Sequence, residues 1–509
     1  MMFSFIDNLL DHITMYRLLL YYLIGLIAAA IGLSLTGVLH FSAISIAVST
    51  ITIVVACWII NEIFATIFKA PKNVESVYIT ALILALIIAP FASFQFVNLT
   101  FLLAASGLAM ASKYILTIRK KHIFNPAAIA VALTALGPRQ SASWWVGATA
   151  LLPFVLIGGI LLVRKIHRGR MVLTFFVTTL LATTLYSLIL KGDVFSSLHN
   201  TLFTSAMFFL GFVMLTEPLT TPPTANKQTW YAALTGLLFP PQFHILSLYS
   251  TPELALITGN VFSYIISPKA KLFPKLKQKL RLTPDSADFI FSPERKKFYY
   301  LPGQYMEWTF PHDGVDSRGN RRYFTLASSP TEPDIRIGIK FHNQGSSFKE
   351  ALLRMNHRTP IVASQVSGDF VLPKDPKQKL VFIAGGIGVT PYRSMVKYLL
   401  DTNGIRDITM LYSARTAKDF AYQDVFEEAR EKIRLNMVYV ITDEPTSAND
   451  SSRTKQINAE MIRKEVPDYR QRLFYISGTH AMVVAIQAVL ASLGVPKHQI
   501  KVDYFSGYA

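Results

Sequence analysis

Charged side chains are scarce in the first half of this 509-residue chain. Residues 1–268 contain 14 Lys and Arg and 7 Asp and Glu, about 8% of that stretch, whereas residues 269–509 contain 36 and 25, about 25%. An ordinary soluble protein has roughly 25% charged residues. A stretch with so little charge cannot cover itself with a water-soluble surface, so a single globular domain is excluded. The composition instead predicts a membrane domain over 1–268 joined to a soluble part.

Cysteine is nearly absent as well, since Cys57 is the single one and lies in an apolar run. This excludes a disulfide framework, a structural zinc cluster and a cysteine-ligated iron–sulfur cluster within the chain, and we expect no metal site. Histidine is missing from the middle of the apolar runs, where axial haem ligands would have to stand, so a haem-carrying membrane reductase is not expected. Asp7 and Asp11 precede the first apolar run in place of a basic stretch, so no cleavable signal peptide is expected.

The net charge of +18 would suit nucleic acid, yet the basic residues flank apolar segments and do not interleave with aromatic ones. We therefore expect these residues to contact anionic headgroups of the cytoplasmic leaflet, and we expect no nucleic-acid partner.

The first half offers ten apolar stretches near the length of about 20 residues that a membrane-spanning helix needs. They are 16–38, 42–68, 76–96, 98–117, 125–138, 144–163, 171–190, 199–216, 229–248 and 252–268. Basic clusters such as Arg119 to Lys121 and Arg164 to Arg170 follow the even-numbered stretches. By the positive-inside rule both termini are then cytoplasmic. The expected location is the cell membrane, with multiple spans and the soluble part on the cytoplasmic side.

Two loop sequences on the cytoplasmic side combine proline with polar residues. His122-Ile123-Phe124-Asn125-Pro126-Ala127 opens the fifth stretch, and Thr216-Glu217-Pro218-Leu219-Thr220-Thr221 follows the eighth. A proline at a helix end leaves backbone groups available to a ligand. The residues alone leave two interpretations open: simple helix termination, or a site in which Asn125 and Glu217 contact an ion or a flavin.

Both loop sequences resemble the corresponding segments of the membrane subunits of the sodium-translocating NADH:quinone reductase and the Rnf ferredoxin:NAD oxidoreductase, a family that also has ten spans. The resemblance covers most of 16–268 and implies an electron-transfer domain. Members commonly carry FMN on a Thr that ends an Asp-x-x-Ser-Gly-Ala-Thr motif. Here Gly147-Ala148-Thr149 matches that end, while Val146 replaces the Ser and Ser143 stands at the place of the Asp. Thr149 is thus where the resemblance implies a second flavin, FMN or riboflavin, with a non-covalent flavin or a quinone as the open alternative.

The soluble half divides into three parts by pattern. A basic tether over 269–282 alternates lysine with apolar residues and suits a membrane surface. From 283 to 376, short alternating runs broken by Pro, Gly and Asn predict an antiparallel β-barrel. From 377 to 509, apolar strands alternate with helical stretches, as in an α/β doubly wound parallel sheet. The expected fold class is therefore multi-domain, with an α-helical polytopic membrane bundle before these parts.

Four motifs follow one another in the soluble half. The run from Arg322 to Thr325 offers a guanidinium fork for a diphosphate, a ring to cover a flavin and a hydroxyl for the flavin N5 edge. Gly345-Ser346-Ser347 opens a helix with amides that suit a diphosphate. Gly385 to Pro391 is a strand end, a glycine turn and a helix start, and Ser477-Gly478 with Met482 is a second such turn.

This order of motifs resembles the ferredoxin-NADP reductase superfamily over roughly 283–509. The resemblance implies that FAD is bound by Arg322, Tyr323, Phe324, Thr325, Ser328, Gly345, Ser346 and Ser347. It implies that the nicotinamide nucleotide is bound by Gly385, Gly386, Gly388, Thr390, Pro391, Gly478 and Met482. Thr325, Ser477 and Phe505 would act in hydride transfer, with Ser477 at a position where many members have Cys. NADH or NADPH stays open, because Ser413 and Arg415 suit either a 2′-phosphate site or a solvated loop.

The combined pattern predicts an FAD-dependent NAD(P)H oxidoreductase that passes electrons to a second flavin, a quinone or another acceptor in its membrane domain, with sodium or proton transport as an option. Additional subunits are compatible with this interpretation. Two other classes stay open from the sequence: a transporter whose reductase-like part senses redox state, and a membrane-anchored NAD(P)H reductase without ion coupling.

Overall fold

The structure is a computed structural model that describes residues 6, 9–10, 13–68, 74–91, 96–119, 121–136, 140–267, 271–293, 299–316, 318–341, 345–443 and 456–505. The chain forms two compact units, Met1–Lys271 and Leu272–Ala509. They are called the N-terminal unit and the C-terminal unit below.

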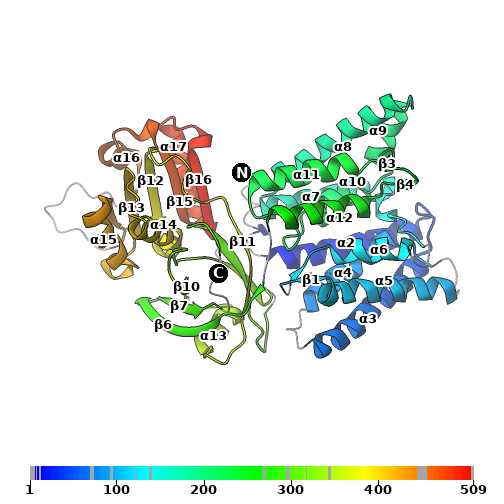
Figure 1. Ribbon diagram of the computed structural model, residues 1–509, viewed down its shortest axis with the longest axis horizontal. Coiled ribbons are helices and arrows are strands. Elements are labelled where there is room, and N and C mark those ends of the chain that lie inside the picture. Colours follow the sequence, from blue (N-terminus) through cyan, green and yellow to red (C-terminus); the bar gives the residue numbers. More distant parts are fainter. Residues whose placement is uncertain are drawn as a thin grey trace. The chain divides into compact units, whose positions relative to one another are not determined.

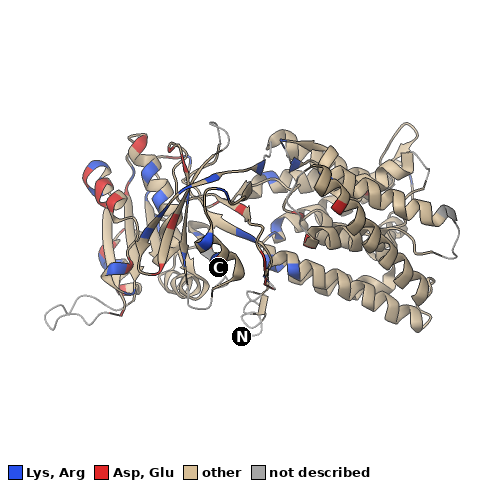
Figure 2. Ribbon diagram, turned by 90° about the horizontal axis from the view of Figure 1, so that it is seen from below, with Lys and Arg blue, Asp and Glu red and all other residues tan. Residues whose placement is uncertain are grey.

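The N-terminal unit is built from helices (Figure 1). In chain order they are α2 (Met15–Leu35), α3 (Ala43–Ile67), α4 (Val74–Ile87), α5 (Phe96–Ile115), α6 (Pro126–Leu136), α7 (Leu152–Ile166), α8 (Gly169–Ile189), α9 (Val194–Phe203), α10 (Met207–Phe209), the π-helix η3 (Leu210–Met214), α11 (Ala225–Leu238) and α12 (Pro252–Ile266). Two short hairpins join them: β1 (Thr117–Ile118) with β2 (Lys121–His122), and β3 (His244–Ile245) with β4 (Leu248–Tyr249). Figure 2 shows these helices with few charged residues, whereas the C-terminal unit carries many.

Four helical stretches among the described residues are long and apolar enough to cross a membrane: Met15–Leu35, Ala43–Ile67, Thr149–Ile166 and Gly169–Ile189. A fifth is formed if α9 and Met207–Met214, which meet at a bend of 54°, count as one broken span. Every predicted stretch contains a helix, but several helices are shorter than the apolar run that predicted them. Apolar composition alone does not distinguish a span from irregular chain buried inside the bundle. The unit is thus membrane-associated by composition, and the count of ten spans stays a prediction.

The predicted sixth span illustrates the difference, because its first residues are not α-helical. They form two 3₁₀ turns, η1 (Trp145–Gly147) and η2 (Thr149–Leu151), before α7 begins. The indole of Trp145 donates to the carbonyl of Ala85 at 2.9 Å, and the indole of Trp144 donates to Glu253 Oε2 at 2.8 Å. Irregular backbone at membrane depth requires such partners within the protein.

The first part of the C-terminal unit consists of two antiparallel sheets around one core. One has the order β10-β7-β6, with β6 (Lys275–Thr283), β7 (Ser286–Ser292) and β10 (Ile335–Lys340). The other has the order β5-β11-β8-β9, with β5 (Lys271–Leu272), β8 (Tyr305–Thr309), β9 (Arg321–Thr325) and β11 (Val362–Ser367). Helix α13 (Ser347–Arg354) packs on this core through Phe348 and Leu352. The two sheets belong to the predicted antiparallel region, and their closure into a barrel stays a prediction.

The predicted tether over 269–282 differs from the structure. Most of it is strand β6, which pairs antiparallel with β7 from Lys275 opposite Ser292 to Thr283 opposite Ser286. Leu276 is buried in the core while Lys277 is exposed. The alternation of lysine and leucine is therefore that of a half-buried edge strand, a pattern that also fits a surface-bound tether.

The second part of the C-terminal unit is a parallel sheet of order β14-β13-β12-β15-β16. Its strands are β12 (Leu380–Gly385), β13 (Ile408–Ala414), β14 (Asn436–Ile441), β15 (Leu473–Thr479) and β16 (Ile500–Phe505). Helices α14 (Thr390–Asp401) and α15 (Gln423–Ile433) cover one face, and α16 (Ala459–Glu465) and α17 (His480–Ser492) cover the other (Figure 1). The strand order reverses direction between β12 and β15, which is where nucleotides bind in open sheets of this kind.

A buried polar network joins the two parts of the C-terminal unit. Arg393 of α14 donates to the carbonyl of Ala327 at 2.9 Å and forms a two-pronged ion pair with Glu332. Asp288 of β7 accepts from the hydroxyl of Tyr422 at 3.1 Å and pairs with Arg336 at 3.4 Å. Because these partners come from both parts, the network fixes α14 against the antiparallel sheets.

Candidate functional site

The glycine turn after β12 is the tightest part of the candidate site. A Cβ on Gly388 would lie 2.6 Å from the Ser477 carbonyl oxygen and 2.7 Å from the Gly478 nitrogen. A Cβ on Gly385 would lie 2.1 Å from Met482 Sδ. The two sequence motifs that end β12 and β15 therefore meet backbone to backbone, which only glycine permits.

The same turn leads directly into a helix. The 3₁₀ turn η4 (Gly386–Val389) continues into α14, with Pro391 in its first turn and the Thr390 hydroxyl donating to the Ile387 carbonyl at 3.2 Å. Gly386 has a φ of +53° and open space where a Cβ would be. A glycine turn followed by a helix N-terminus offers amides and a favourable dipole to a pyrophosphate.

Thr325, Ser477 and Asp503 lie together where the antiparallel sheets meet the parallel sheet. The Thr325 hydroxyl donates to Asp503 Oδ2 at 3.5 Å, and Asp503 stands opposite Ser477 in the pairing of β15 and β16. Burial raises the pKa of Asp503 to about 6, and the Thr325 hydrogen bond offsets part of that rise. The Ser477 hydroxyl is fully buried and has no hydrogen-bond partner within the described residues. An orphaned buried hydroxyl is unusual and fits a group that receives a ligand.

Arg322 and the start of α13 form a cationic corner in the antiparallel part. The Arg322 guanidinium donates to the carbonyls of Arg318, Gly319 and Arg321 and lies over the Phe348 ring at 5.2 Å. It is also 4.0 Å from Asp316 Oδ1.

The Asp316 carboxylate occupies the helix start itself. Its Oδ2 accepts from the Ser347 amide at 3.0 Å and from Arg318 Nη2 at 2.7 Å. Burial raises the pKa of Asp316, but the hydrogen bonds from Arg318 and from the Ser347 amide lower it by more. The pKa of Asp316 therefore lies below its usual value. The corner thus holds an oxyanion, as a diphosphate site must.

Other predicted flavin contacts have different surroundings. Phe324 is packed inside the core, with its ring centroid 5.9 Å from that of Phe348, while Tyr323 is half-buried and donates to Glu307 at 2.8 Å. The Ser328 hydroxyl is 2.9 Å from the Tyr300 hydroxyl and accepts from the Arg336 amide at 3.1 Å, so it is engaged within the unit.

Two further predicted residues of the second motif serve the start of α13. Ser346 caps the helix by accepting from the Lys349 amide at 3.3 Å. The Gly345 carbonyl accepts from Arg318 at 3.4 Å. Because these contacts fix the helix start, they hold the Ser347 amide at the cationic corner.

Three predicted site residues lie at or just after strand ends: Ser413 and Arg415, for the nicotinamide nucleotide, and Phe505, for hydride transfer. Ser413 pairs with Gly385 across β12 and β13, and Arg415 forms an ion pair with Asp285 at 3.3 Å. Phe505 is the last residue of β16 and its backbone pairs with Thr479. The Phe505 side chain lies outside the described residues.

In the N-terminal unit the structure brings together the two loop motifs. The Asn125 side chain donates to Glu217 Oε2 at 2.9 Å and accepts from the amides of Ala127 and Ala128, both at 3.1 Å. Thr220 also donates to Glu217, at 3.1 Å. Asn125 thus both begins α6 and holds the carboxylate, so helix termination and a polar site coexist.

Further polar groups surround this pair. His122 Nε2 lies 3.8 Å from Glu217 Oε1, and Asn260 of α12 accepts from the Asn125 amide at 2.8 Å. Arg168 donates to the Thr216 carbonyl at 2.8 Å and so holds the start of the Glu217 loop. We call Asn125, His122, Glu217, Thr220 and Asn260 the polar cluster.

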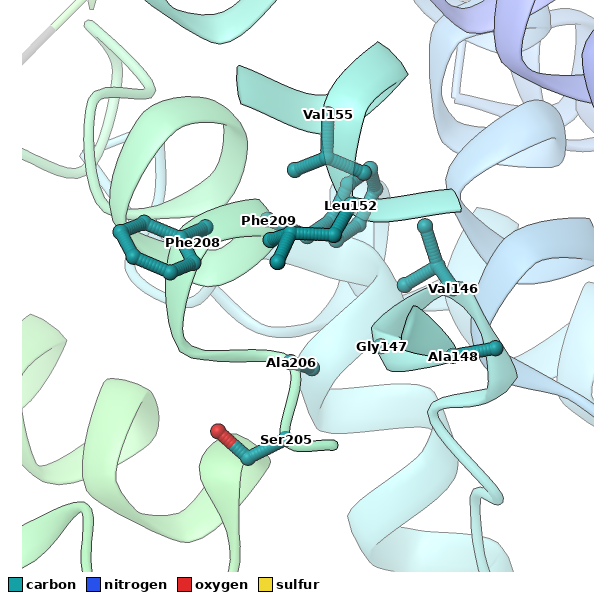
Figure 3. A pocket seen from close by; sticks show the side chains of 9 residues that line it. All are labelled: Val146, Gly147, Ala148, Leu152, Val155, Ser205, Ala206, Phe208 and Phe209. Atoms are coloured by element: carbon teal, nitrogen blue, oxygen red, sulfur yellow. The ribbon is translucent and has the colours of Figure 1, made fainter. Parts of the chain in front are cut away.

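Thr149 belongs to a different place in this unit. It is exposed, and its hydroxyl donates to the Phe203 carbonyl at 2.8 Å, at the break between α9 and α10. A small, mostly apolar pocket adjoins it, lined by Val146, Gly147, Ala148, Leu152, Val155, Ser205, Ala206, Phe208 and Phe209 (Figure 3). A Cβ on Gly147 would lie 2.7 Å from the Ser205 carbonyl carbon, so the turn and the break are in close backbone contact. No group of His, Cys, Asp or Glu that could hold a metal ion occurs in the described ranges.

Comparison with known proteins finds a family match in each unit. In the C-terminal unit, residues 382–488 match the family model of the oxidoreductase NAD-binding domain. In the N-terminal unit, residues 133–267 match the model of the NQR2, RnfD, RnfE family. Both resemblances inferred from the sequence motifs are thereby confirmed.

Among curated proteins the chain is similar to a glycine betaine monooxygenase reductase subunit of Chromohalobacter salexigens, with 29% identity over 42% of this chain and 58% of that one. It is also similar to a flavohemoprotein of Bacillus cereus, with 25% identity over 45% and 59%. The chain therefore spans less than two thirds of the length of these relatives. Among solved structures, a cytochrome P450 reductase of Amycolatopsis matches 47% of this chain and 70% of its own, at 21% identity and a TM-score of 0.41. The flavohem-like FAD/NAD binding domain of a Vibrio cholerae nitric oxide dioxygenase matches 46% and 98%, at 22% identity and a TM-score of 0.40.

Three residues of the site are not among those that the sequence motifs predict: Asp316, Lys349 and Asp503. Asp503 is the one acidic residue in the last strand, which is the signal that could have marked it. Asp316 and Lys349 carry no such signal, because charged residues are common in loops and helices of soluble proteins. Their role depends on folding of the loop before β9 over the start of α13.

Proposed function

We propose that the chain is a membrane-integral flavoprotein oxidoreductase that takes hydride from NAD(P)H onto FAD and passes electrons to an acceptor held by its N-terminal unit. The observation that carries this proposal is the convergence of two motifs on the paired residues Ser477 and Asp503. Gly388 of the glycine turn packs against Ser477, and Thr325 of β9 donates to Asp503. When bound, FAD would convert a two-electron hydride donor into a source of single electrons. The matched domain classes of the two units support the pairing.

The residues of the C-terminal unit fit both groups. Arg322 and the Ser347 amide would hold the FAD diphosphate in place of the Asp316 carboxylate. Thr325 would donate to the flavin edge, and the orphaned Ser477 hydroxyl would face the nicotinamide. Gly385, Gly386 and Gly388 with the start of α14 would hold the nucleotide pyrophosphate. Phe505 would stack near the flavin, as the resemblance to the ferredoxin-NADP reductase superfamily implies.

The polar cluster is our proposed acceptor site in the N-terminal unit. A carboxylate and two side-chain amides held by buried and half-buried hydrogen bonds suit the polar edge of a flavin or quinone, or a coupling cation. Thr149 is the proposed site of a second flavin. We further propose ten spans, with the C-terminal unit and both loop motifs on the cytoplasmic side, and transport of sodium or protons as an option of the same electron path.

The test uses the purified full chain in detergent. Acid precipitation releases non-covalent flavin, and we expect FAD in the supernatant and, if Thr149 is modified, a second flavin that stays with the protein. NADH should be oxidised with an added quinone. Failure to oxidise NADH or NADPH with any quinone or artificial acceptor would contradict the proposal. A single released FAD, with quinone reduction insensitive to Glu217, would instead indicate an anchored reductase without an acceptor site in the membrane.

We expect Glu217→Gln to lower quinone reduction by about tenfold or more, since the negative charge of a half-buried hydrogen-bond acceptor is lost. Reduction of ferricyanide should be unchanged, because that acceptor takes electrons from the C-terminal unit directly. The matched control is Glu62→Gln on α3, a carboxylate in the same unit but outside the polar cluster. Equal quinone activity in Glu217→Gln and Glu62→Gln would exclude the polar cluster as the acceptor site.

The raised pKa of Asp503 has a consequence for stability. The Asp503 carboxyl has a pKa of about 6 in the folded chain and 3.8 in the unfolded chain. Its preference for the proton in the folded chain stabilises the fold fully below about pH 4. This stabilisation is lost as the pH rises through 6. We expect Asp503→Asn to be more stable than the unmodified chain at pH 7.5, by about 1–2 kcal/mol, and equally stable near pH 4. Thermal melting of the two proteins across this range gives the difference, and a difference independent of pH would be inconsistent with titration of Asp503.

A further inference from the structure

Lys349 is a buried cation in the cationic corner that no motif points to. It lies in the first turn of α13, is 3% exposed, and its Nζ donates to the Lys340 carbonyl at 2.6 Å. No carboxylate contacts this Nζ in the described part of the chain. A buried ammonium without a counter-charge is costly, so its presence calls for a reason.

The groups around Lys349 come from every neighbouring element and are mainly cationic. Arg322 projects from β9, Arg318 from the loop before it and Lys340 from β10, and all three act on Lys349 through their charge. His312, in the segment after β8, lies 3.0 Å from the Ser347 hydroxyl. Two carboxylates lie among these cations. Asp316 forms an ion pair with Arg318, and Asp285 forms one with Lys340 at 2.8 Å. The corner therefore holds more positive than negative charge, and an added anion would be stabilised there.

We propose that Lys349 is a further cation of the FAD diphosphate site and that it binds a proton when FAD binds. This inference rests on the proposed function, because it requires FAD in the antiparallel part of the C-terminal unit. The diphosphate brings two negative charges beside Arg322, at the helix start whose first turn contains Lys349. An ammonium that repels its neighbours in the free protein would then gain a partner.

Proton uptake by Lys349 would make the affinity for FAD depend on pH in one direction. Burial, followed by repulsion from Arg322, Arg318 and Lys340, lowers the pKa of Lys349 to about 8 in the protein without flavin. A bound diphosphate raises this pKa, since opposite charge favours the protonated form. Below pH 8 Lys349 already carries its proton, whereas above pH 8 binding must take one up. The affinity for FAD therefore falls as the pH rises through 8, by up to tenfold per pH unit.

The experiment measures FAD binding by the flavin-depleted full chain in detergent, by quenching of flavin fluorescence at pH 7 and pH 9. Calorimetry at pH 8.5 in two buffers of different ionisation enthalpy counts the protons taken up. We expect weaker binding at pH 9 and net proton uptake, with neither effect for riboflavin, which lacks the phosphates. Lys349→Met should bind FAD at least about tenfold more weakly at pH 7 and without the uptake.

The matched control is Lys279→Met. The Lys279 ammonium also donates to a backbone carbonyl, that of Leu353 at 2.6 Å. Unlike Lys349, Lys279 is exposed and lies on β6. It should keep both the affinity and the proton uptake. Lys349→Arg keeps the charge at all pH values, so it should bind FAD without the loss at pH 9, which a purely structural lysine would not predict.

The possible outcomes separate this inference from the function on which it rests. Binding of FAD by the unmodified chain with no proton uptake, and with equal affinity in Lys349→Met, would overturn the role of Lys349 and leave the reductase intact. Absence of FAD binding by the unmodified chain at either pH would overturn both. If Lys349→Met does not fold, the unmodified chain and Lys349→Arg still decide through proton uptake and the affinity at pH 9.

Discussion

Gly388→Val is expected to slow NADH-driven reduction of the bound flavin by about 100-fold or more. The added Cβ would lie 2.6–2.7 Å from backbone atoms of Ser477 and Gly478, and backbone in two paired parallel strands cannot move away as a flexible side chain can. The turn must therefore shift by about an ångström, a displacement that costs about 10²-fold where two reactants have to be aligned. Stopped-flow bleaching of flavin absorbance after mixing with NADH measures the rate.

The control for this variant is Gly494→Asn. Gly494 also has a positive φ, +75°, but open space surrounds its missing Cβ, and Asn tolerates this conformation. It should bleach at the rate of the unmodified chain. Gly388→Val should still contain FAD, because the diphosphate site around Arg322 does not include this turn. Bleaching at an unchanged rate in Gly388→Val would show that the nucleotide does not approach the β12 turn.

The order of elements in the C-terminal unit could be predicted from the sequence because each signal there is local. An apolar run of five residues, three glycines and a Thr-Pro pair define a strand, a turn and a helix start without help from distant residues. The same holds for β15 and Gly478. In the structure, Arg322 and Thr325 both lie on β9, and their spacing of three residues puts the two side chains on opposite faces of the sheet.

Contacts between segments distant in sequence were harder to predict. The lysines of 275–283 alternate with apolar residues both in a tether and in a strand, and only the pairing with β7 decides between them. The sequence does not distinguish Phe324 from Tyr323 as the flavin contact, because the core face of a strand depends on what packs beneath it. The pairing of Asn125 with Glu217 joins residues 92 positions apart. The proline motifs marked both loops, but no local signal shows that they meet.

Removing Arg393 is expected to produce the largest loss of stability, about 3 kcal/mol or more in Arg393→Ala. The guanidinium is 4% exposed and pairs with Glu332, which is itself mostly buried. Without Arg393, Glu332 keeps only its longer ion pair with Arg336, at 3.6 Å. Breaking a buried pair by removing one partner costs about 3–5 kcal/mol. Thermal release of FAD, followed by the rise in flavin fluorescence, reports unfolding of the C-terminal unit. Arg430→Ala is the control, since the Arg430–Glu427 pair on α15 is exposed and should contribute less than about 1 kcal/mol.

The cause of the loss can be separated from simple loss of packing by a double variant. Arg393→Met keeps most of the side-chain volume but leaves the Glu332 charge without Arg393, so it should be nearly as unstable as Arg393→Ala. Adding Glu332→Gln removes that charge and keeps an oxygen for the Ser329 amide, which donates to Glu332 Oε2 at 2.6 Å. We therefore expect the double variant to melt at a higher temperature than Arg393→Met alone, although it lacks one more native charge. A double variant that melts lower than Arg393→Met would mean that Glu332 stabilises α14 through other partners, Arg336 first among them at 3.6 Å.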